Sequence, residues 1–246
     1  MTGGPEPQRL TVPWLLVLHL TPGIVFTAIL TVVSRAFVRH GLTAYLAEIL
    51  LIPACLAPML LGIILLWSAR ADRGLSLVRP LAYREPGSVL DYTVLPLVLF
   101  LCGALCSLLV APATTFLEDL VRPWFPQQLT SEAMLGGIAS AAPGARRAAL
   151  LAAALFSGVM APLVEEAYFR GFLLPRMRHL GRLAPVLSAF LFGLYHFFAP
   201  WNLPAIFVAF LPVAFVVQAK RNFRIGVVMH AMLNLNGVLI LTLRYW

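Results

Sequence analysis

The chain has 246 residues, of which 61% are hydrophobic and only 11% are charged, and its mean hydropathy is +0.89. A water-soluble domain is about half apolar and about a quarter charged, so this chain has too few charged residues to cover a water-facing surface. The formal net charge is +8, from 18 basic and 10 acidic residues. The basic residues are scattered between apolar runs and form no single patch. We therefore exclude nucleic acid as a partner and expect a lipid bilayer.

Long apolar segments recur along the whole chain. A helix needs about 20 apolar residues to cross a bilayer, and about seven segments approach that length: 11–33, 43–68, 89–112, 147–169, 183–199, 203–219 and 225–243. No segment alternates apolar and polar residues as the strands of a membrane barrel do. The sequence therefore predicts an all-α fold, a polytopic membrane bundle of about seven transmembrane helices. Arg9 is the only basic residue before the first apolar segment, and no small-residue cleavage pattern follows that segment. We therefore expect the segment to remain as the first spanning helix and not to be a cleaved signal peptide.

The longest connection between these segments covers residues 113–146. We expect a surface loop on the outer side, with a short helix over Thr114–Val121 and Trp124 as an interface anchor. On this basis we divide the chain into N-terminal transmembrane helices with a long extracytoplasmic loop, 1–146, and a C-terminal transmembrane core, 147–246. No internal repeat of the kind found in many transporters is visible.

The distribution of Arg and Lys predicts the orientation in the membrane. With seven spans, one side holds the N-terminus and the loops after spans two, four and six. That side carries Arg9, Arg70, Arg73, Arg79, Arg84, Arg176, Arg178, Arg182, Lys220, Arg221 and Arg224. The other side carries Arg35, Arg39, Arg122, Arg146, Arg147 and Arg244. Because cytoplasmic loops are enriched in basic residues, we expect the N-terminus in the cytoplasm and the C-terminus outside.

Three charged residues lie close together at the end of the fourth segment. Ionisable groups inside a membrane are costly and are candidates for function. Glu166 and Arg170 are separated by four residues with the acid first, so they can pair along one helix face. Glu165 points about 100° away on a helix of 3.6 residues per turn, and it is left without that partner. Glu165 is therefore a candidate general base, although a salt-bridge cluster at the membrane edge remains an alternative.

Two further apolar segments carry polar side chains that packing does not require. His196 lies near the end of the fifth segment, one turn after Phe192, and is a natural titrating partner for a carboxylate unless it belongs to the interfacial aromatic belt. His230 and Asn234 share one face of the seventh segment. Together they could donate hydrogen bonds to a developing oxyanion, or they could be polar contacts between helices.

The remaining polar residues of the apolar segments carry weaker signals. Glu48 and Asp91 lie near segment ends, where water can reach them. Cys55, Cys102 and Cys106 have no further metal ligands nearby, so we expect small packing residues.

Three motifs in order resemble the CAAX-protease and bacteriocin-processing (CPBP) family of intramembrane endopeptidases, which is related to the type II CAAX prenyl endopeptidases. The motifs are Glu165-Glu166-x-x-x-Arg170, Phe192-x-x-x-His196 and His230-x-x-x-Asn234, and the resemblance covers about residues 147–240.

The resemblance implies a role for each of these residues. Glu165 and His196 activate the water that attacks a peptide carbonyl, His230 and Asn234 hold the oxyanion, and Glu166 and Arg170 support the site. The family was first called metalloprotease, but a metal-free, glutamate-type mechanism is now the better description. The zinc signature His-Glu-x-x-His is absent from the chain. We therefore expect no cofactor, with zinc held by Glu165, His196 and His230 as the alternative.

The expected function is thus an intramembrane peptidase of the cell membrane that acts on a peptide or protein substrate. Removal of a C-terminal tail and the processing of a peptide are both open. The alternative outside enzymology is a membrane carrier or scaffold of the same fold, although a carrier should show repeat symmetry.

Overall fold

The computed structural model describes residues 7–70 and 74–246, and this part of the chain is helical with no strand. Six helical segments are long and apolar enough to cross a membrane: Val12–Arg39, Ala44–Arg70, Val89–Leu109, Pro143–Arg176, Pro200–Lys220 and Arg224–Tyr245. One shorter apolar helix covers Leu183–Tyr195. The prediction of an all-α, polytopic membrane bundle is therefore confirmed, with six long spans and one short one where seven were expected.

The first half of the chain supplies three of the long segments. Helix α1 covers Val12–Arg39. The second segment consists of α2 (Ala44–Leu51), the π-helical turn η1 (Ile52–Leu56) and α3 (Ala57–Arg70). The third consists of α4 (Val89–Tyr92) and α5 (Val94–Leu109). Thr43 caps α2 by accepting a hydrogen bond from the backbone N–H of Leu46 at 3.0 Å, and Ser88 and Asp91 form a capping box at α4.

The fourth segment is continuous and contains two π-helical stretches. It runs through α8 (Pro143–Leu155), η4 (Phe156–Met160), α9 (Ala161–Glu166), η5 (Ala167–Leu173) and α10 (Leu174–Arg176). Both η4 and η5 are π-helical. Pro162 has no backbone N–H to donate to the preceding turn, which accounts for the wider turn before it. Wide turns of this kind are frequent at functional sites, and the two glutamates lie between them.

The fifth and sixth apolar segments form a hairpin. After the 3₁₀ turn η6 (Arg178–Leu180), α11 covers Leu183–Tyr195, η7 covers Pro200–Asn202 and α12 covers Leu203–Lys220. The predicted span 183–199 was too long, because the helix ends at Tyr195. In a continued helix the ring of Pro200 would clash with the carbonyl group of His196, four residues earlier, so the helix does not extend to residue 199. Helix α13 (Arg224–Tyr245) completes the bundle.

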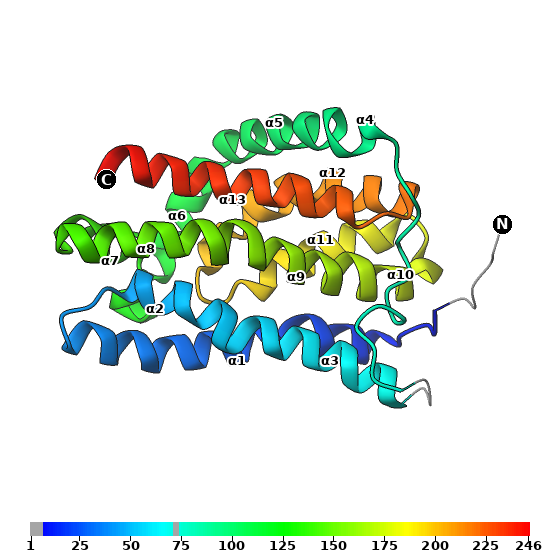
Figure 1. Cartoon of the computed structure of the whole chain (residues 1–246), viewed down its shortest axis with the longest axis horizontal. Helices are drawn as coiled ribbons and strands as arrows, with labels where there is room; N and C mark the ends of the chain where they lie inside the picture. The colour runs from blue at the N-terminus through cyan, green and yellow to red at the C-terminus, as the bar shows by residue number, and fades with distance from the viewer. Residues whose placement is uncertain (1–6, 71–73) are drawn as a thin grey trace.

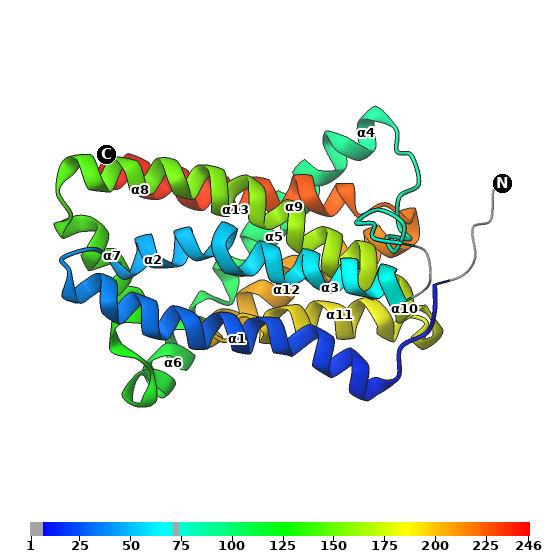
Figure 2. The same ribbon diagram turned by 60° about the horizontal axis from the view of Figure 1, so that its bottom comes forward.

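Figures 1 and 2 show the long helices running roughly side by side, with α5 at the periphery. The start of α1 and the end of α13 lie at opposite ends of the bundle (Figure 1), which agrees with an odd number of crossings. The ends of α3, α10 and α12 lie at the same end as the start of α1.

The connection before the fourth segment is more ordered than a surface loop. It contains α6 (Ala111–Val121), η2 (Arg122–Trp124), η3 (Gln127–Leu129) and α7 (Ser131–Ser140). Glu118 is buried and accepts a hydrogen bond from the backbone N–H of Ser131 at 2.8 Å. Gln128 donates to the carbonyl oxygen of Thr31 in α1 at 3.3 Å. Trp124 is 82% exposed, as an interface anchor would be.

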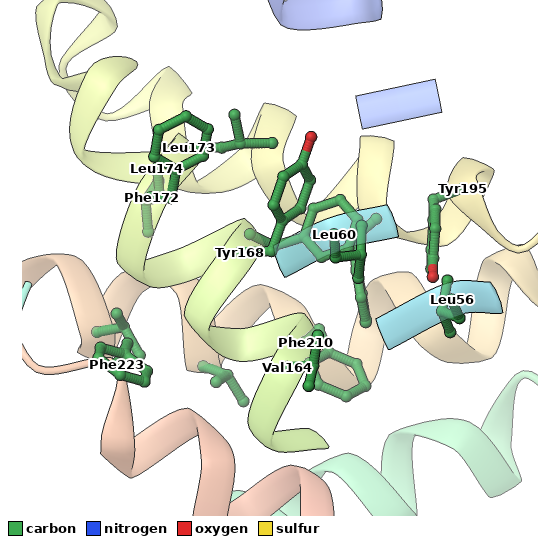
Figure 3. Packing of buried hydrophobic residues seen from close by; sticks show 14 of the residues in the cluster. Leu56, Leu60, Val164, Tyr168, Phe172, Leu173, Leu174, Tyr195, Phe210 and Phe223 are labelled. Atoms are coloured by element: carbon green, nitrogen blue, oxygen red, sulfur yellow. The ribbon is translucent and has the colours of Figure 1, made fainter. Parts of the chain in front are cut away.

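The main hydrophobic core draws residues from both halves of the chain. Figure 3 shows Leu60 of the second segment near Tyr168 of the fourth, and Leu56 of the second segment near Tyr195 of α11. Phe169 makes edge-on contacts with Phe192 and Tyr195, with ring centroids 5.0 and 4.8 Å apart. These rings from the fourth segment and α11 surround the charged residues described next.

Candidate active site

Glu166 and Arg170 form an ion pair inside the bundle. Nη1 of Arg170 lies 3.0 Å from Oε1 of Glu166, and both side chains are fully buried. The pair that the spacing predicted is thus present. Removing one partner of a buried pair leaves an uncompensated charge and costs about 3–5 kcal/mol, so the two residues depend on each other.

Two aromatic rings hold the other side of Arg170. Its guanidinium carbon lies 4.0 Å from the ring centroid of Phe192 and 5.0 Å from that of Phe210. Cation–π contacts of this kind are worth about 2 kcal/mol or more when they are desolvated. The ion pair and the two rings therefore fix the position of Arg170, and through it the position of Glu166.

Glu165 points to a different set of partners. The hydroxyl group of Tyr195 donates a hydrogen bond to Oε1 of Glu165 at 3.1 Å. Nε2 of His230 lies 3.8 Å from Oε2 of the same carboxylate. Glu165 is only 5% exposed. It is separate from the Glu166–Arg170 pair, as the helix geometry predicted, but it has Tyr195 and His230 as neighbours of its own.

His230 lies between the two carboxylates. Its Nδ1 is 3.2 Å from Oε1 of Glu166 and donates to it, while its Nε2 faces Glu165. In a neutral imidazole that donates from Nδ1, Nε2 carries a lone pair. The imidazole of His230 thus lies between the two carboxylates, at 3.2 Å from one and 3.8 Å from the other.

His196 approaches the same aromatic cluster from the end of α11. Its ring lies edge-on to Phe192 and Tyr195, with ring centroids 4.9 Å apart in both cases. Nδ1 is 2.7 Å from the carbonyl oxygen of Phe192. A carbonyl oxygen only accepts, so Nδ1 donates, and Nε2 of the neutral ring keeps its lone pair. Among the residues described, no hydrogen bond or ion pair joins His196 directly to Glu165.

Asn234 does not contact the carboxylates. Its side-chain amide donates to the carbonyl oxygen of Ser157 in η4 at 2.9 Å, and the residue is half-buried. It follows His230 by one turn of α13, so the two side chains project from the same helix face. Asn236 is exposed.

The depth of this cluster can be estimated from the helix rise. His230 is six residues from Arg224, and Glu165 is eleven from Arg176, which places them about 9 and about 16 Å from one end of the bundle at 1.5 Å per residue. The hydrocarbon core of a bilayer is about 30 Å thick. The cluster therefore lies between the ends of α10 and α12 and about the middle of the bilayer.

Two glycines make room for the site, and sequence reasoning missed both. A Cβ atom on Gly226 would overlap Oε2 of Glu166, and a Cβ atom on Gly23 would overlap the carbonyl oxygen of Tyr195. Gly226 thus lets α13 approach the buried carboxylate, and Gly23 lets α1 approach the end of α11. The only signal in the sequence for this close approach was that Gly226 lies one turn before His230. Tyr195 was also missed, since its position beside His196 did not predict that its hydroxyl group would reach Glu165.

The other acidic residues within the spans lie apart from this cluster. Asp91 forms an ion pair with Lys220, with Oδ1 and Nζ 2.9 Å apart, and caps α4. Glu48 is half-buried in α2. All three cysteines are free.

The donor set for the alternative zinc ion is not assembled. No group of three His, Cys, Asp or Glu side chains that could hold a metal occurs in the described part of the chain. Nδ1 of His230 is directed at Glu166, which is not one of the three ligands of that alternative, and Nε2 lies 3.8 Å from Oε2 of Glu165.

Comparison with known proteins adds one finding. Residues 147–236 match the family model for type II CAAX prenyl endopeptidases, Rce1-like. Neither a curated protein nor a solved structure gives a match. The matched residues run from α8 into α13 and include every member of the cluster. Over residues 147–236 the chain is therefore similar to the Rce1-like type II CAAX prenyl endopeptidases, which supports the resemblance seen in the three motifs.

Proposed function

We propose that this protein is an intramembrane endopeptidase that hydrolyses a peptide bond with a water activated by Glu165 and His196. The proposal rests on the observation that the two adjacent carboxylates have different partners. Glu166 is occupied by Arg170, whereas Glu165 faces only a hydroxyl donor and an imidazole. A carboxylate held in this way is suited to accept a proton from water.

The proposed reaction begins with a water near Glu165 and Nε2 of His196. The water loses a proton to Glu165, and its oxygen attacks the peptide carbonyl carbon to form a tetrahedral intermediate. His230 and Asn234 stabilise the oxyanion, which requires a proton on Nε2 of His230 and a turn of the Asn234 amide from Ser157 towards the substrate. The proton on Glu165 then passes to the leaving amine as the C–N bond breaks.

The ring orientation of His196 supports its part in this scheme. Nδ1 donates to the Phe192 carbonyl oxygen, so the free lone pair is on Nε2, where it can accept a hydrogen bond from water. The contact between His230 and Glu165 supports a second assignment, in which His230 is the partner of the base. His196 is the partner in the proposed reaction, and the activities of His196→Ala and His230→Gln distinguish the two assignments.

The substrate is proposed to be a peptide or protein tail cut near the membrane surface. The cluster lies about 9–16 Å from the bundle end that carries most of the Arg and Lys residues. We propose that the protein lies in the cell membrane. Because cytoplasmic loops are enriched in basic residues, this end of the bundle and the N-terminus would face the cytoplasm. We propose a metal-free reaction, because the described side chains do not converge as zinc ligands do.

The decisive experiment compares the full-length wild type with Glu165→Gln in the native host. Mass spectrometry of C-terminal peptides from the membrane fraction would identify tails whose removal requires Glu165. Glu48→Gln is the matched control, because Glu48 also lies within a span but outside the cluster. Tails that are cut equally in wild type and Glu165→Gln, with both proteins folded and expressed, would support a scaffold or carrier instead.

The roles within the site are tested with the same substrates. His196→Ala should abolish cleavage, whereas Asn234→Ala should leave residual activity, because one oxyanion donor contributes about 10²–10³ in rate. Full activity in His196→Ala together with loss in His230→Gln would move the role of base partner to His230.

A further inference from the structure

A groove lies between the first two spans, away from the charged cluster. It has a volume of about 500 Å³ and is lined by the start of α1 and the end of α3. Cavities of about 300–1,000 Å³ are typical of sites that bind small molecules. Its apolar walls are formed by Trp14, Leu18, Ile63, Leu66 and Trp67. None of the residues of the candidate active site lines it.

One end of the groove is polar and cationic. Gln8, Arg9, Thr11 and Arg70 line it there. Arg9 and Arg70 are exposed, and neither forms an ion pair with any residue that the structure describes. Guanidinium groups bind phosphate oxygens through paired hydrogen bonds, so two of them at one mouth match an anionic phosphate group.

A third cation lies behind the apolar wall. The guanidinium carbon of Arg176 is 5.3 Å from the ring centroid of Trp67, and Arg176 is 4% exposed. It donates to the carbonyl oxygens of Pro80 and Phe172, and among the described residues it has no carboxylate partner. Its charge adds to the positive potential at this end of the groove.

The long axis of the groove suits a chain-bearing ligand. Thr11 to Leu18 and Ile63 to Arg70 each span seven residues, or about 10 Å of helix. A small inorganic anion would leave this apolar wall uncovered, and a neutral apolar ligand would leave the arginines unmatched. Trp14 is 54% exposed and Leu66 is 61% exposed, so the groove is open on the lipid-facing side of the bundle.

We propose that this groove binds one anionic phospholipid, with its phosphate between Arg9 and Arg70 and an acyl chain along Leu18 and Ile63. The site belongs to the membrane leaflet at the arginine-rich end of the bundle. Each basic residue near the membrane surface raises the affinity for anionic lipids by about fivefold. The inference is independent of the peptidase reaction.

The test uses tryptophan fluorescence of the full-length protein in phosphatidylcholine vesicles. Trp124 and Trp246 are replaced by Phe, so that the tryptophans left are Trp14 and Trp67, which line the groove, and the buried Trp201. Phosphatidylglycerol with brominated acyl chains should quench this fluorescence at a lower mole fraction than brominated phosphatidylcholine. Arg9→Gln and Arg70→Gln should each reduce that preference by about fivefold.

Arg39→Gln is the matched control, because Arg39 is an exposed arginine at the opposite end of α1. It should keep the wild-type preference. Circular dichroism in the same vesicles checks that each variant retains its helix content. Equal quenching by the two brominated lipids, an unchanged preference in the double variant of Arg9 and Arg70, or the same loss in Arg39→Gln would each overturn the proposal.

Discussion

The hydroxyl group of Tyr195 and the carboxylate of Glu165 are joined by a hydrogen bond of 3.1 Å between α11 and α9. Both side chains are buried, and the donor is the last residue of its helix. The residue that follows it is His196, so one helix end presents both a donor to the carboxylate and an imidazole. The positions of Tyr195 and His196 in the site therefore depend on where α11 ends.

Tyr195→Phe removes this hydrogen bond and keeps the ring packing against Phe169 and Phe192. A hydrogen bond to a charged group contributes about 1.5–3 kcal/mol. If the bond orients Glu165 for the reaction, the rate of cleavage should fall by about 10- to 100-fold. The rate is measured as peptide release from a quenched fluorescent substrate. This substrate carries either a prenylated CAAX end that the wild type cleaves or a tail identified in the native host.

Tyr168→Phe is the control for this variant. The Tyr168 hydroxyl group donates to the carbonyl oxygen of Leu18 at 2.8 Å and not to the site. It should lower the thermal midpoint in detergent without changing the rate per folded molecule. Equal rate losses in the two variants would contradict a specific role for Tyr195.

Gly226→Ala should disturb the site through crowding. The new methyl group would overlap Oε2 of Glu166, and this carboxylate cannot move freely because its other oxygen, Oε1, pairs with Arg170. Overpacking of a core costs about 1–3 kcal/mol, so both the thermal midpoint and the cleavage rate should fall. Gly237→Ala on the same helix meets nothing within 4 Å and should be neutral or slightly stabilising. A fully stable and active Gly226→Ala protein would show that the close approach is unimportant.

Chelation should leave activity unchanged, because no group of three His, Cys, Asp or Glu side chains in the described part of the chain is arranged to hold a metal ion. The measurement is the cleavage rate after dialysis against EDTA and a zinc-selective chelator, with a zinc-dependent protease treated in parallel. Stoichiometric zinc in the purified protein, with activity lost on its removal and regained on its return, would decide for the zinc-dependent mechanism.

Reporter fusions should place the two ends of α13 on opposite sides of the membrane. A periplasmic-type reporter such as alkaline phosphatase should be active after Trp246 and inactive after Lys220, because the segment Arg224–Tyr245 crosses between them. A cytoplasmic reporter should give the reverse pattern. Cytoplasmic activity after Trp246 would contradict the predicted orientation.

Much of the architecture follows from the sequence because its causes are local. Apolar runs of about 20 residues specify membrane helices, since a spanning segment must satisfy its own backbone hydrogen bonds. The spacing of Glu166 and Arg170 likewise predicted their contact, which is the consequence of helical periodicity alone. The family resemblance of the segment around them was also visible in the order of its motifs, and the family match over 147–236 agrees with it.

The partners of Glu165 were decided by the tertiary structure. The residue that donates to it is 30 positions away on another helix, and no local pattern distinguishes Tyr195 from other aromatic residues of an apolar segment. The early end of α11, the position of His230 between two carboxylates and the clearance at Gly23 and Gly226 depend on how closely separate helices pack. Helical periodicity specifies which face a side chain occupies, but only the packing of the bundle specifies which other face it meets.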